Sequence, residues 1–300
     1  MTNKSITEKP SETALMAALR RDLAHKEYKN DKFGPDHLAG IFLPAYFRFF
    51  LKFKRIQQNT IARLNEALPG LNEYMIARTA YFDQLFREAL KQKTSQIVLL
   101  GAGYDTRAYR FAKLNHASKI YELDAAPTQN RKLECLKKAR IEIPEIVNFV
   151  SIDFNTQSSK DTLLSAGYQN DQKTLFIWEG VSYYLEPESV DQTLEFVCEN
   201  SHPESSLALD YTISVTDDNI DAFYGVREFI HTMQEHHGSE VLLFSIPEGK
   251  IKSFLESRGF RLVEHLDNQQ IEERYLTDEN GQLIGHMTGH FRFATASPTD

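Results

Sequence analysis

The chain alternates between short runs of consecutive apolar residues and longer stretches in which apolar residues recur at helical spacing. Consecutive apolar positions are typical of parallel strands that are covered on both faces. Two further strand-like runs near the C-terminus have a loop rather than a helix between them, so we expect them to pair antiparallel. The predicted strands are residues 97–100, 119–124, 147–154, 174–179, 206–211, 260–265 and 287–295. The pattern predicts the α/β class, with a doubly wound, mostly parallel, seven-stranded Rossmann-like sheet and an antiparallel C-terminal strand.

Residues 41–53, IFLPAYFRFFLKF, form the most aromatic stretch of the chain. It is too short to cross a bilayer, and Pro44 and Arg48 interrupt it. Two interpretations remain open: the stretch is part of a lid over a hydrophobic ligand, or it packs onto the core. Packing onto the core is the favoured one, because large aromatic side chains dominate protein cores.

A glycine turn follows the predicted strand 97–100. Gly101 and Gly103 permit a tight turn and a close approach of a ligand to the backbone, and a helical pattern begins around Thr106. The next predicted strand ends with Asp124, about 20 residues after the glycines, which is the spacing at which a carboxylate reaches a ribose. Because Thr106 replaces the third glycine of a dinucleotide site, the turn favours a nucleoside without phosphates, such as S-adenosylmethionine. A strand-to-helix turn without any ligand is the alternative.

Composition narrows the class of protein. Charged residues make up 25% and hydrophobic residues 41% of the 300 positions, which is ordinary for a globular protein. The net charge of −8 argues against a nucleic-acid partner. Cys135 and Cys198 have no CxxC spacing, so a reduced, cytoplasmic setting is expected. No apolar run reaches about 18 residues, so no membrane partner is expected, and no carboxylate or Cys set accompanies His231, His236 and His237, so no metal is expected.

Five motifs occur in order along the chain: IARTAYFD at 76–83, GAGYDTRAYR at 101–110, YELDAAP at 121–127, SIDF at 151–154 and EGVSYYL at 179–185. Together they resemble the leucine carboxyl methyltransferase family of class I S-adenosylmethionine-dependent methyltransferases. The resemblance covers about residues 12–295. It implies that the Rossmann-like sheet binds S-adenosylmethionine as cofactor.

The resemblance also implies roles for residues of the glycine turn and the strand ends. Gly101 and Gly103 would lie against the methionine part of the cofactor, and Asp124 would accept both ribose hydroxyls. Asp153 matches the residue that binds the exocyclic amine of adenine. Phe154 would stack on the adenine ring or donate its backbone N–H to it.

Further matches concern the methionine end of the cofactor. Arg78 matches the residue that holds the cofactor's carboxylate with a guanidinium fork, or else it forms an ordinary surface ion pair. Glu179 would face the cofactor's amino group or sulfonium, or else it caps the following helix. Tyr183 and Tyr184 are candidates for orienting the substrate or for packing. A basic residue of the first helix assists in this family, and the candidates are Arg20, Arg21 and Lys26.

By this resemblance the chain is expected to be an O-methyltransferase for a carboxylate of a small molecule or peptide. Residues 1–12 would be a disordered lead-in, 13–90 a helical lid and 91–300 the core, with a lid insertion at about 212–240. An NAD(P)-dependent oxidoreductase and a non-catalytic regulator that binds S-adenosylmethionine are the alternatives. The sequence does not indicate the acceptor or the oligomeric state.

Overall fold

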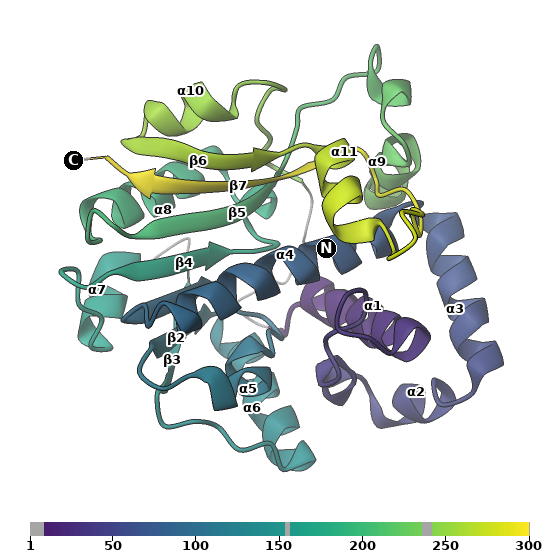
Figure 1. Ribbon diagram of the computed structural model, residues 1–300, viewed down its shortest axis with the longest axis horizontal. Helices are drawn as coiled ribbons and strands as arrows, with labels where there is room; N and C mark the ends of the chain where they lie inside the picture. The colour runs from purple at the N-terminus through teal and green to yellow at the C-terminus, as the bar shows by residue number, and fades with distance from the viewer. Residues whose placement is uncertain (1–8, 154–156, 236–241, 300) are drawn as a thin grey trace.

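One seven-stranded sheet organises the protein. The computed structural model describes residues 9–153, 157–235 and 242–299 (Figure 1). The strand order is β3-β2-β1-β4-β5-β7-β6. Strands β1 to β5 pair in parallel, whereas β7 pairs antiparallel with both β5 and β6. The strands are β1 Gln96–Leu100, β2 Lys119–Asp124, β3 Val147–Ser151, β4 Thr174–Trp178, β5 Ser206–Thr212, β6 Phe260–Leu266 and β7 Phe291–Pro298. The predicted fold class is confirmed.

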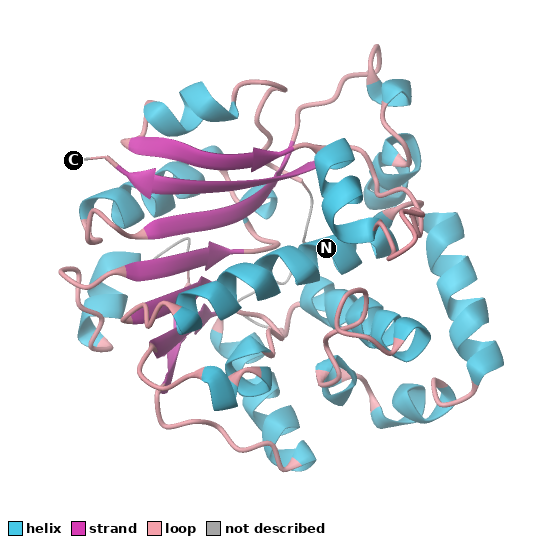
Figure 2. Cartoon of the chain, viewed as in Figure 1, coloured by secondary structure: helices cyan, strands magenta, loops and turns pink. Residues whose placement is uncertain are grey.

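Helices cover both faces of the sheet (Figure 2). The α-helices are α1 Glu12–Tyr28, α2 Ala45–Phe50, α3 Lys54–Ala67, α4 Leu71–Lys91, α5 Arg107–Arg110, α6 Ala126–Ala139, α7 Ser159–Ser165, α8 Pro187–Glu199, α9 Val226–Glu235, α10 Ile251–Glu256 and α11 Asn268–Ile271. Five shorter turns are η1 Ala39–Phe42, η2 Ala112–Leu114, η3 Ser182–Tyr184, η4 Ile220–Ala222 and the π-helical η5 Glu272–Leu276. No helix among these described segments is long and apolar enough to cross a membrane.

Strand β1 shows why the central runs are apolar at every position. All five of its residues are buried. Because successive side chains of a strand point to opposite faces, Ile97 and Leu99 lie in the core shared with α4, whereas Val98 and Leu100 lie in the core shared with α8. A strand that is buried on both faces has no place for an alternating polar residue.

The N-terminal helices lie beyond the end of the sheet toward which the arrows of β4 and β6 point (Figure 1). Helix α1 begins where the Ser11 hydroxyl accepts the Ala14 N–H at 3.0 Å. Helix α4 begins directly after Gly70, which has φ 77° and where an added Cβ would overlap the Thr288 backbone nitrogen. Helices α1 and α4 pack against each other near the carboxyl ends of the parallel strands.

Several element boundaries differ from the sequence prediction. The segment between β6 and β7 is not a plain loop, because Asp267 and Gln270 form a capping box that starts α11, and Ile271 and Leu276 are buried. The third strand ends at Ser151 rather than at residue 154, and the last strand begins at Phe291. The helix predicted from Thr106 is a single turn, because the chain passes directly into η2.

The aromatic stretch 41–53 also departs from prediction. Phe42 and Leu43 are buried, but Tyr46, Phe49 and Phe53 are exposed to solvent. Packing of the whole stretch onto the core was therefore wrong, because Phe42, Leu43 and Leu51 pack against α1 and its surroundings while most of the aromatic side chains between them do not.

Candidate active site

A cavity of about 350 Å³ opens at the carboxyl ends of β1, β2 and β4. Its floor is the glycine turn after β1, and its sides come from α1, the first half of α4, η3, α9 and the start of β7. This is the edge at which open α/β sheets bind ligands. Eight residues singled out from the sequence line the cavity: Arg78, Gly101, Gly103, Asp124, Asp153, Glu179, Tyr183 and Tyr184. Phe154, His236 and His237 lie outside the described residues.

The glycine turn is shaped by its own backbone. Gly101 has φ 74° and Gly103 φ 46°, and a Cβ added to Gly101 would overlap the Val181 side chain. Asp124 fastens the turn, because one carboxylate oxygen accepts the Gly103 N–H and the other accepts the Ala125 N–H at 2.7 Å. Each oxygen has a second lone pair that can accept a hydroxyl. The turn therefore presents a preorganised carboxylate to the cavity.

Thr106, in the place of a third glycine, makes the turn unsuited to binding a pyrophosphate. Thr106 is buried, and its hydroxyl donates to Asp36 Oδ1 at 2.8 Å while it accepts from Arg110 Nε at 2.7 Å. The one-turn helix α5 that follows does not offer a long helix N-terminus for a pyrophosphate. Both observations agree with a nucleoside rather than a dinucleotide.

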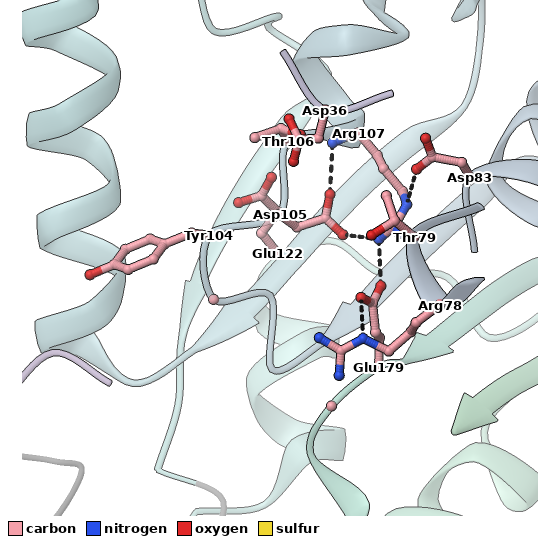
Figure 3. Close-up of polar contacts among 12 residues, drawn as sticks. Asp36, Arg78, Thr79, Asp83, Tyr104, Asp105, Thr106, Arg107, Glu122 and Glu179 are labelled. Carbon is pink, nitrogen blue, oxygen red and sulfur yellow. Dashed lines mark hydrogen bonds and ion pairs between the residues drawn. The ribbon is translucent and has the colours of Figure 1, made fainter. Parts of the chain in front are cut away.

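Arg107 and Arg110, one turn apart on α5, were not expected to take part in the site. Their guanidinium groups turn inward onto Asp83. Arg107 Nε lies 2.8 Å from Oδ1 (Figure 3), and Arg110 Nη1 lies 2.6 Å from Oδ2. Arg107 Nη1 also lies 2.6 Å from Asp105 Oδ2 and 2.6 Å from Glu179 Oε2. The motifs IARTAYFD and GAGYDTRAYR thus contact each other through ion pairs. The two arginines of the second motif, three positions apart, were the sequence feature that could have revealed this contact.

Arg78 lies on the other side of Glu179. Its Nε is 3.1 Å from Glu179 Oε1, an ion pair whose angle does not make a hydrogen bond, and Nη1 donates to Tyr183 at 3.3 Å (Figure 3 shows Arg78 and Glu179). Nη1 also lies 3.4 Å from Asp210 Oδ2. Burial opposes the charge, but Tyr74, Glu179 and Asp210 together raise the pKa of Arg78 above its ordinary value. Arg78 therefore stays charged, and the surface ion pair considered as its alternative is wrong, because the guanidinium is buried.

Asp210 of β5 is a residue that the sequence analysis missed. It is fully buried, it accepts the Tyr74 hydroxyl, and its Oδ1 accepts the Gly180 N–H at 2.7 Å. Burial, and then the Asp210 charge, raise the pKa values of Tyr74 and Tyr183 well above normal, so both phenols keep their protons. Tyr183 is therefore a neutral hydrogen-bond partner of Arg78 within this network. The sequence feature that could have revealed Asp210 was a charged residue in the interior of the strand SLALDYT.

The structure separates the three basic candidates of the first helix. Arg21 is tied to Asp36 and to the Tyr104 carbonyl, each at 2.8 Å, and Lys26 pairs with Asp22 one turn earlier. Arg20 lines the cavity, and its Nη1 donates to Asn72. Its Nη2 is buried and makes no hydrogen bond to any residue in the described part of the chain. Arg20 is thus the candidate with unused donor capacity.

Asp153 is the strand-end residue after β3. It lies two residues beyond the strand, and its N–H donates to Gln157 Oε1 at 2.8 Å. Among the described residues, no group of three or more His, Cys, Asp or Glu side chains is arranged to hold a metal ion.

Comparison with known proteins identifies the family. A sequence profile described as leucine carboxyl methyltransferase matches residues 14–198, more than half of the chain. The chain belongs to the leucine carboxyl methyltransferase family. A Bacillus subtilis protein named as a candidate S-adenosyl-L-methionine-dependent methyltransferase, YktD, is 29% identical over 72% of this chain and 70% of its own length. A similarly named Mycobacterium tuberculosis protein, Rv1729c, is 24% identical over 96% of this chain and 94% of its own.

Solved structures agree on the fold of this family member. A candidate methyltransferase from Thermobifida fusca superposes with a TM-score of 0.60, at 14% identity, over 97% of this chain and 96% of its own. A DUF574 family protein from Streptomyces avermitilis also gives a TM-score of 0.60, at 12% identity, over 98% and 99%. The chain is accordingly an S-adenosylmethionine-dependent methyltransferase, as the resemblance implied.

The residues of this methyltransferase fit its cofactor chemically. Asp124, Asp153 and Glu179 lie at the carboxyl ends of β2, β3 and β4, on both sides of β1, and bring carboxylates to the cavity. Acceptor-only oxygens suit ribose hydroxyls and an amine, and negative charge suits a sulfonium. The buried Arg78 Nε without a hydrogen bond is a donor suited to the cofactor's carboxylate.

Proposed function

We propose that this methyltransferase transfers the methyl group to a carboxylate oxygen of a small apolar molecule or peptide. One observation carries the proposal: no His, Lys or Cys occurs among the described residues that line the cavity. A hydroxyl or ammonium acceptor has to lose a proton to a base. A carboxylate is already ionised at neutral pH and needs none.

Two acids of the cavity, Asp36 and Asp105, support the same proposal, because they are poor proton acceptors. Burial opposes ionisation of Asp105, but the Arg107 charge beside it lowers its pKa to about 2. Burial likewise opposes the ionised form of Asp36, and Arg110 and Arg21 lower its pKa below the ordinary value. These two carboxylates form ion pairs with arginines and would not deprotonate an acceptor.

The end of the cavity away from the strand carboxylates suits an apolar acid. Apolar side chains from four elements line it: Met16 and Ala17 from α1, Leu71 and Met75 from α4, Phe229 and Met233 from α9, and Phe291 from β7. Arg20 lies on the same wall. Burial lowers the pKa of Arg20 to about 10, with Glu73 opposing the shift, so the guanidinium remains charged at neutral pH. A guanidinium with an unused nitrogen in an apolar setting is suited to bind a carboxylate.

The N-terminal helices and α9 act as a lid in this proposal. They supply most of the apolar wall, whereas the core supplies the carboxylates. When bound, the cofactor provides a methyl group activated by a positively charged sulfur. The protein's part is to hold the acceptor in line with that methyl group and to exclude water, and orientation of this kind can supply roughly 7–11 kcal/mol.

Calorimetry with S-adenosylmethionine, S-adenosylhomocysteine and NAD tests the cofactor. We expect both sulfur ligands to bind and NAD not to bind. Binding of NAD alone would instead support an NAD(P)-dependent oxidoreductase.

The acceptor is tested with a radiolabelled methyl donor and matched acids, alcohols and amines that share one hydrocarbon chain. Label should enter the acid alone, as an ester that alkali hydrolyses to methanol. Alkali-stable label in the alcohol or amine would contradict a carboxyl acceptor. Cofactor binding without transfer to any of the three would favour the non-catalytic regulator.

The role of Arg20 is tested by Arg20→Met, with Lys26→Met on the same helix as the matched control. Arg20→Met should raise KM for the acid about 10-fold or more, as expected for loss of one charge-assisted contact, and leave cofactor affinity unchanged. An equal effect of Lys26→Met, or weakened cofactor binding in Arg20→Met, would remove Arg20 from the acceptor site.

A further inference from the structure

Helix α2 and the residues that follow it carry four large aromatic side chains that neither pack into the core nor line the cavity. Tyr46, Phe49, Phe50 and Phe53 are exposed by 69%, 56%, 49% and 52%. No residue of α2 itself is buried. Exposed aromatic side chains gathered within eight residues are unusual on a protein that works alone in water, because contiguous apolar surface normally marks an interaction site.

The backbone beneath these rings is anchored. Leu43 and Leu51, which flank α2, are buried in a cluster with Leu19 and Leu23 of α1. Gln57 donates to the Leu51 carbonyl at 2.7 Å and fastens the start of α3. The aromatic side chains are therefore held at the surface by the fold.

The same segment is strongly basic. Residues 37–65 contain no Asp or Glu, although the whole chain has a net charge of −8. Four of its basic side chains are close to the aromatic residues in the sequence, are exposed, and form no described ion pair: Arg48, Lys52, Lys54 and Arg55. Lys52 Nζ lies 5.9 Å from the centroid of the Phe49 ring. We call these eight side chains, four aromatic and four basic, the basic-aromatic patch.

We propose that the basic-aromatic patch docks the protein peripherally on a lipid bilayer that contains anionic headgroups. Aromatic rings partition into the headgroup region, and Lys and Arg side chains around them contact anionic phosphates. Charge complementarity identifies this surface, because its positive side chains form no ion pair with an acidic residue of residues 9–153, 157–235 and 242–299. The expectation of no membrane partner rested on the lack of a spanning segment, which peripheral docking does not require.

Two other occupants fit the patch less well. The rings of Phe49 and Phe50 meet at 74°, and those of Phe49 and Phe53 at 77°. Rings packed edge to face form one apolar cluster rather than separate platforms on which bases stack. A second copy of the chain, bound through the same patch, would place Arg48, Lys52 and their neighbours opposite like charges.

Co-flotation with vesicles tests the proposal. The full chain is mixed with vesicles of phosphatidylcholine alone and with vesicles that also contain phosphatidylglycerol. We expect binding to the anionic vesicles only, and binding should weaken as salt is added. Equal binding to both kinds of vesicle, or binding to neither, would overturn the proposal.

Paired variants separate the two parts of the patch. Lys54→Gln with Arg55→Gln should weaken binding to anionic vesicles about 10- to 30-fold, from roughly fivefold per charge near such a surface. Phe49→Ser with Phe53→Ser should also weaken binding, with less change in its salt dependence. The matched controls are Lys137→Gln with Lys138→Gln on α6, and the exposed Tyr224→Ser. Unchanged cofactor affinity by calorimetry shows that each variant is folded, and an equal effect of patch and control variants contradicts the proposal.

The rival occupants have their own readouts. Patch-dependent binding of a single-stranded RNA, with no binding to vesicles, would reassign the patch to nucleic acid. A concentration-dependent dimer in sedimentation that the Phe49 and Phe53 changes abolish, again without vesicle binding, would reassign it to self-association. Either result overturns membrane docking and leaves the proposed methyl transfer unaffected.

Discussion

The two ends of the cavity are built from opposite materials. The proposed cofactor end is held by buried charges, among them Asp83, Arg107 and Glu179, whose side chains are 1%, 4% and 13% exposed. The proposed acceptor end is held by apolar side chains from α1, α4, α9 and β7, with Arg20 as its charged member. A charged network tolerates little change, because removing one partner leaves another charge buried, whereas an apolar wall can be resized with modest cost. The difference suits an enzyme with a fixed cofactor and a variable acceptor.

The largest effect should come from Asp83→Ala. This change leaves Arg107 and Arg110 without the carboxylate that each contacts by a short ion pair. Loss of one partner of a buried pair costs about 3–5 kcal/mol, and here two arginines share the partner. Urea unfolding should show a loss of this size in the free energy of unfolding.

The control for Asp83 is Glu134→Ala on α6, whose pair with Lys138 is 63% and 75% exposed. We expect less than about 1 kcal/mol there, because water screens exposed pairs. If both variants lose the same small amount, the cofactor end is not held by its charges and the contrast with the acceptor end disappears.

A smaller effect, and one confined to binding, is expected for Asp124→Ala. Its carboxylate accepts the Gly103 and Ala125 N–H groups, and the ion pairs of Arg107 with Asp83 and Glu179 stay intact when it is removed. Loss of two charge-assisted hydrogen bonds to a ribose should weaken cofactor binding at least 100-fold, or about 3 kcal/mol, in a calorimetric titration. Arg78→Ala is a poorer probe, because it would take the cation away from the buried Asp210, although Glu179 would keep Arg107. Unchanged affinity in Asp124→Ala would contradict the assignment of the ribose site.

The cofactor end could be predicted from the sequence to a large extent, since its residues follow strands at short, regular spacing. Gly101 and Glu179 directly follow strands that the apolar pattern already located, and Asp124 is the last residue of another. Their neighbours in space were harder to find. Asp210 belongs to a strand interior, and its pairing with Tyr74 spans 136 positions of the chain, so no local pattern reveals it.

The acceptor end and the outer helices could not be predicted in the same way. Their residues come from elements far apart in the sequence, and each element has an ordinary helical pattern. The stretch 41–53 illustrates the limit: periodicity identifies Phe42 and Phe49 as equally apolar, yet one is buried and the other exposed. Which apolar residues reach the core depends on how η1 and α2 are placed against α1, and that placement is a tertiary property.

The last effect is absent at neutral pH and appears only in acid. It concerns His290, behind the acceptor wall, where the ring packs 4.6 Å from Phe229 and 4.2 Å from Phe291, centroid to centroid. Burial, and then the Arg292 charge, lower the pKa of His290 to about 3. Because the folded pKa lies below the ordinary value of about 6.5, the unfolded chain binds the proton first, and stability present above pH 6.5 is lost as the pH falls. The loss should be about 1.4 kcal/mol per pH unit, or close to 3 kcal/mol at pH 4.5.

His290→Gln removes this titration, so its free energy of unfolding should fall less steeply between pH 6.5 and 4.5 than that of the wild type. Burial opposes the ionised form of Asp105, but the Arg107 charge lowers its pKa to about 2, so the contribution of this carboxylate to stability should be lost only below about pH 4. As the pH falls, the cost of keeping His290 neutral should therefore destabilise the apolar wall before protonation of Asp105 weakens the charged network. Parallel slopes for wild type and His290→Gln above pH 4.5 would contradict this order and show that the two ends of the cavity respond to acid as one unit.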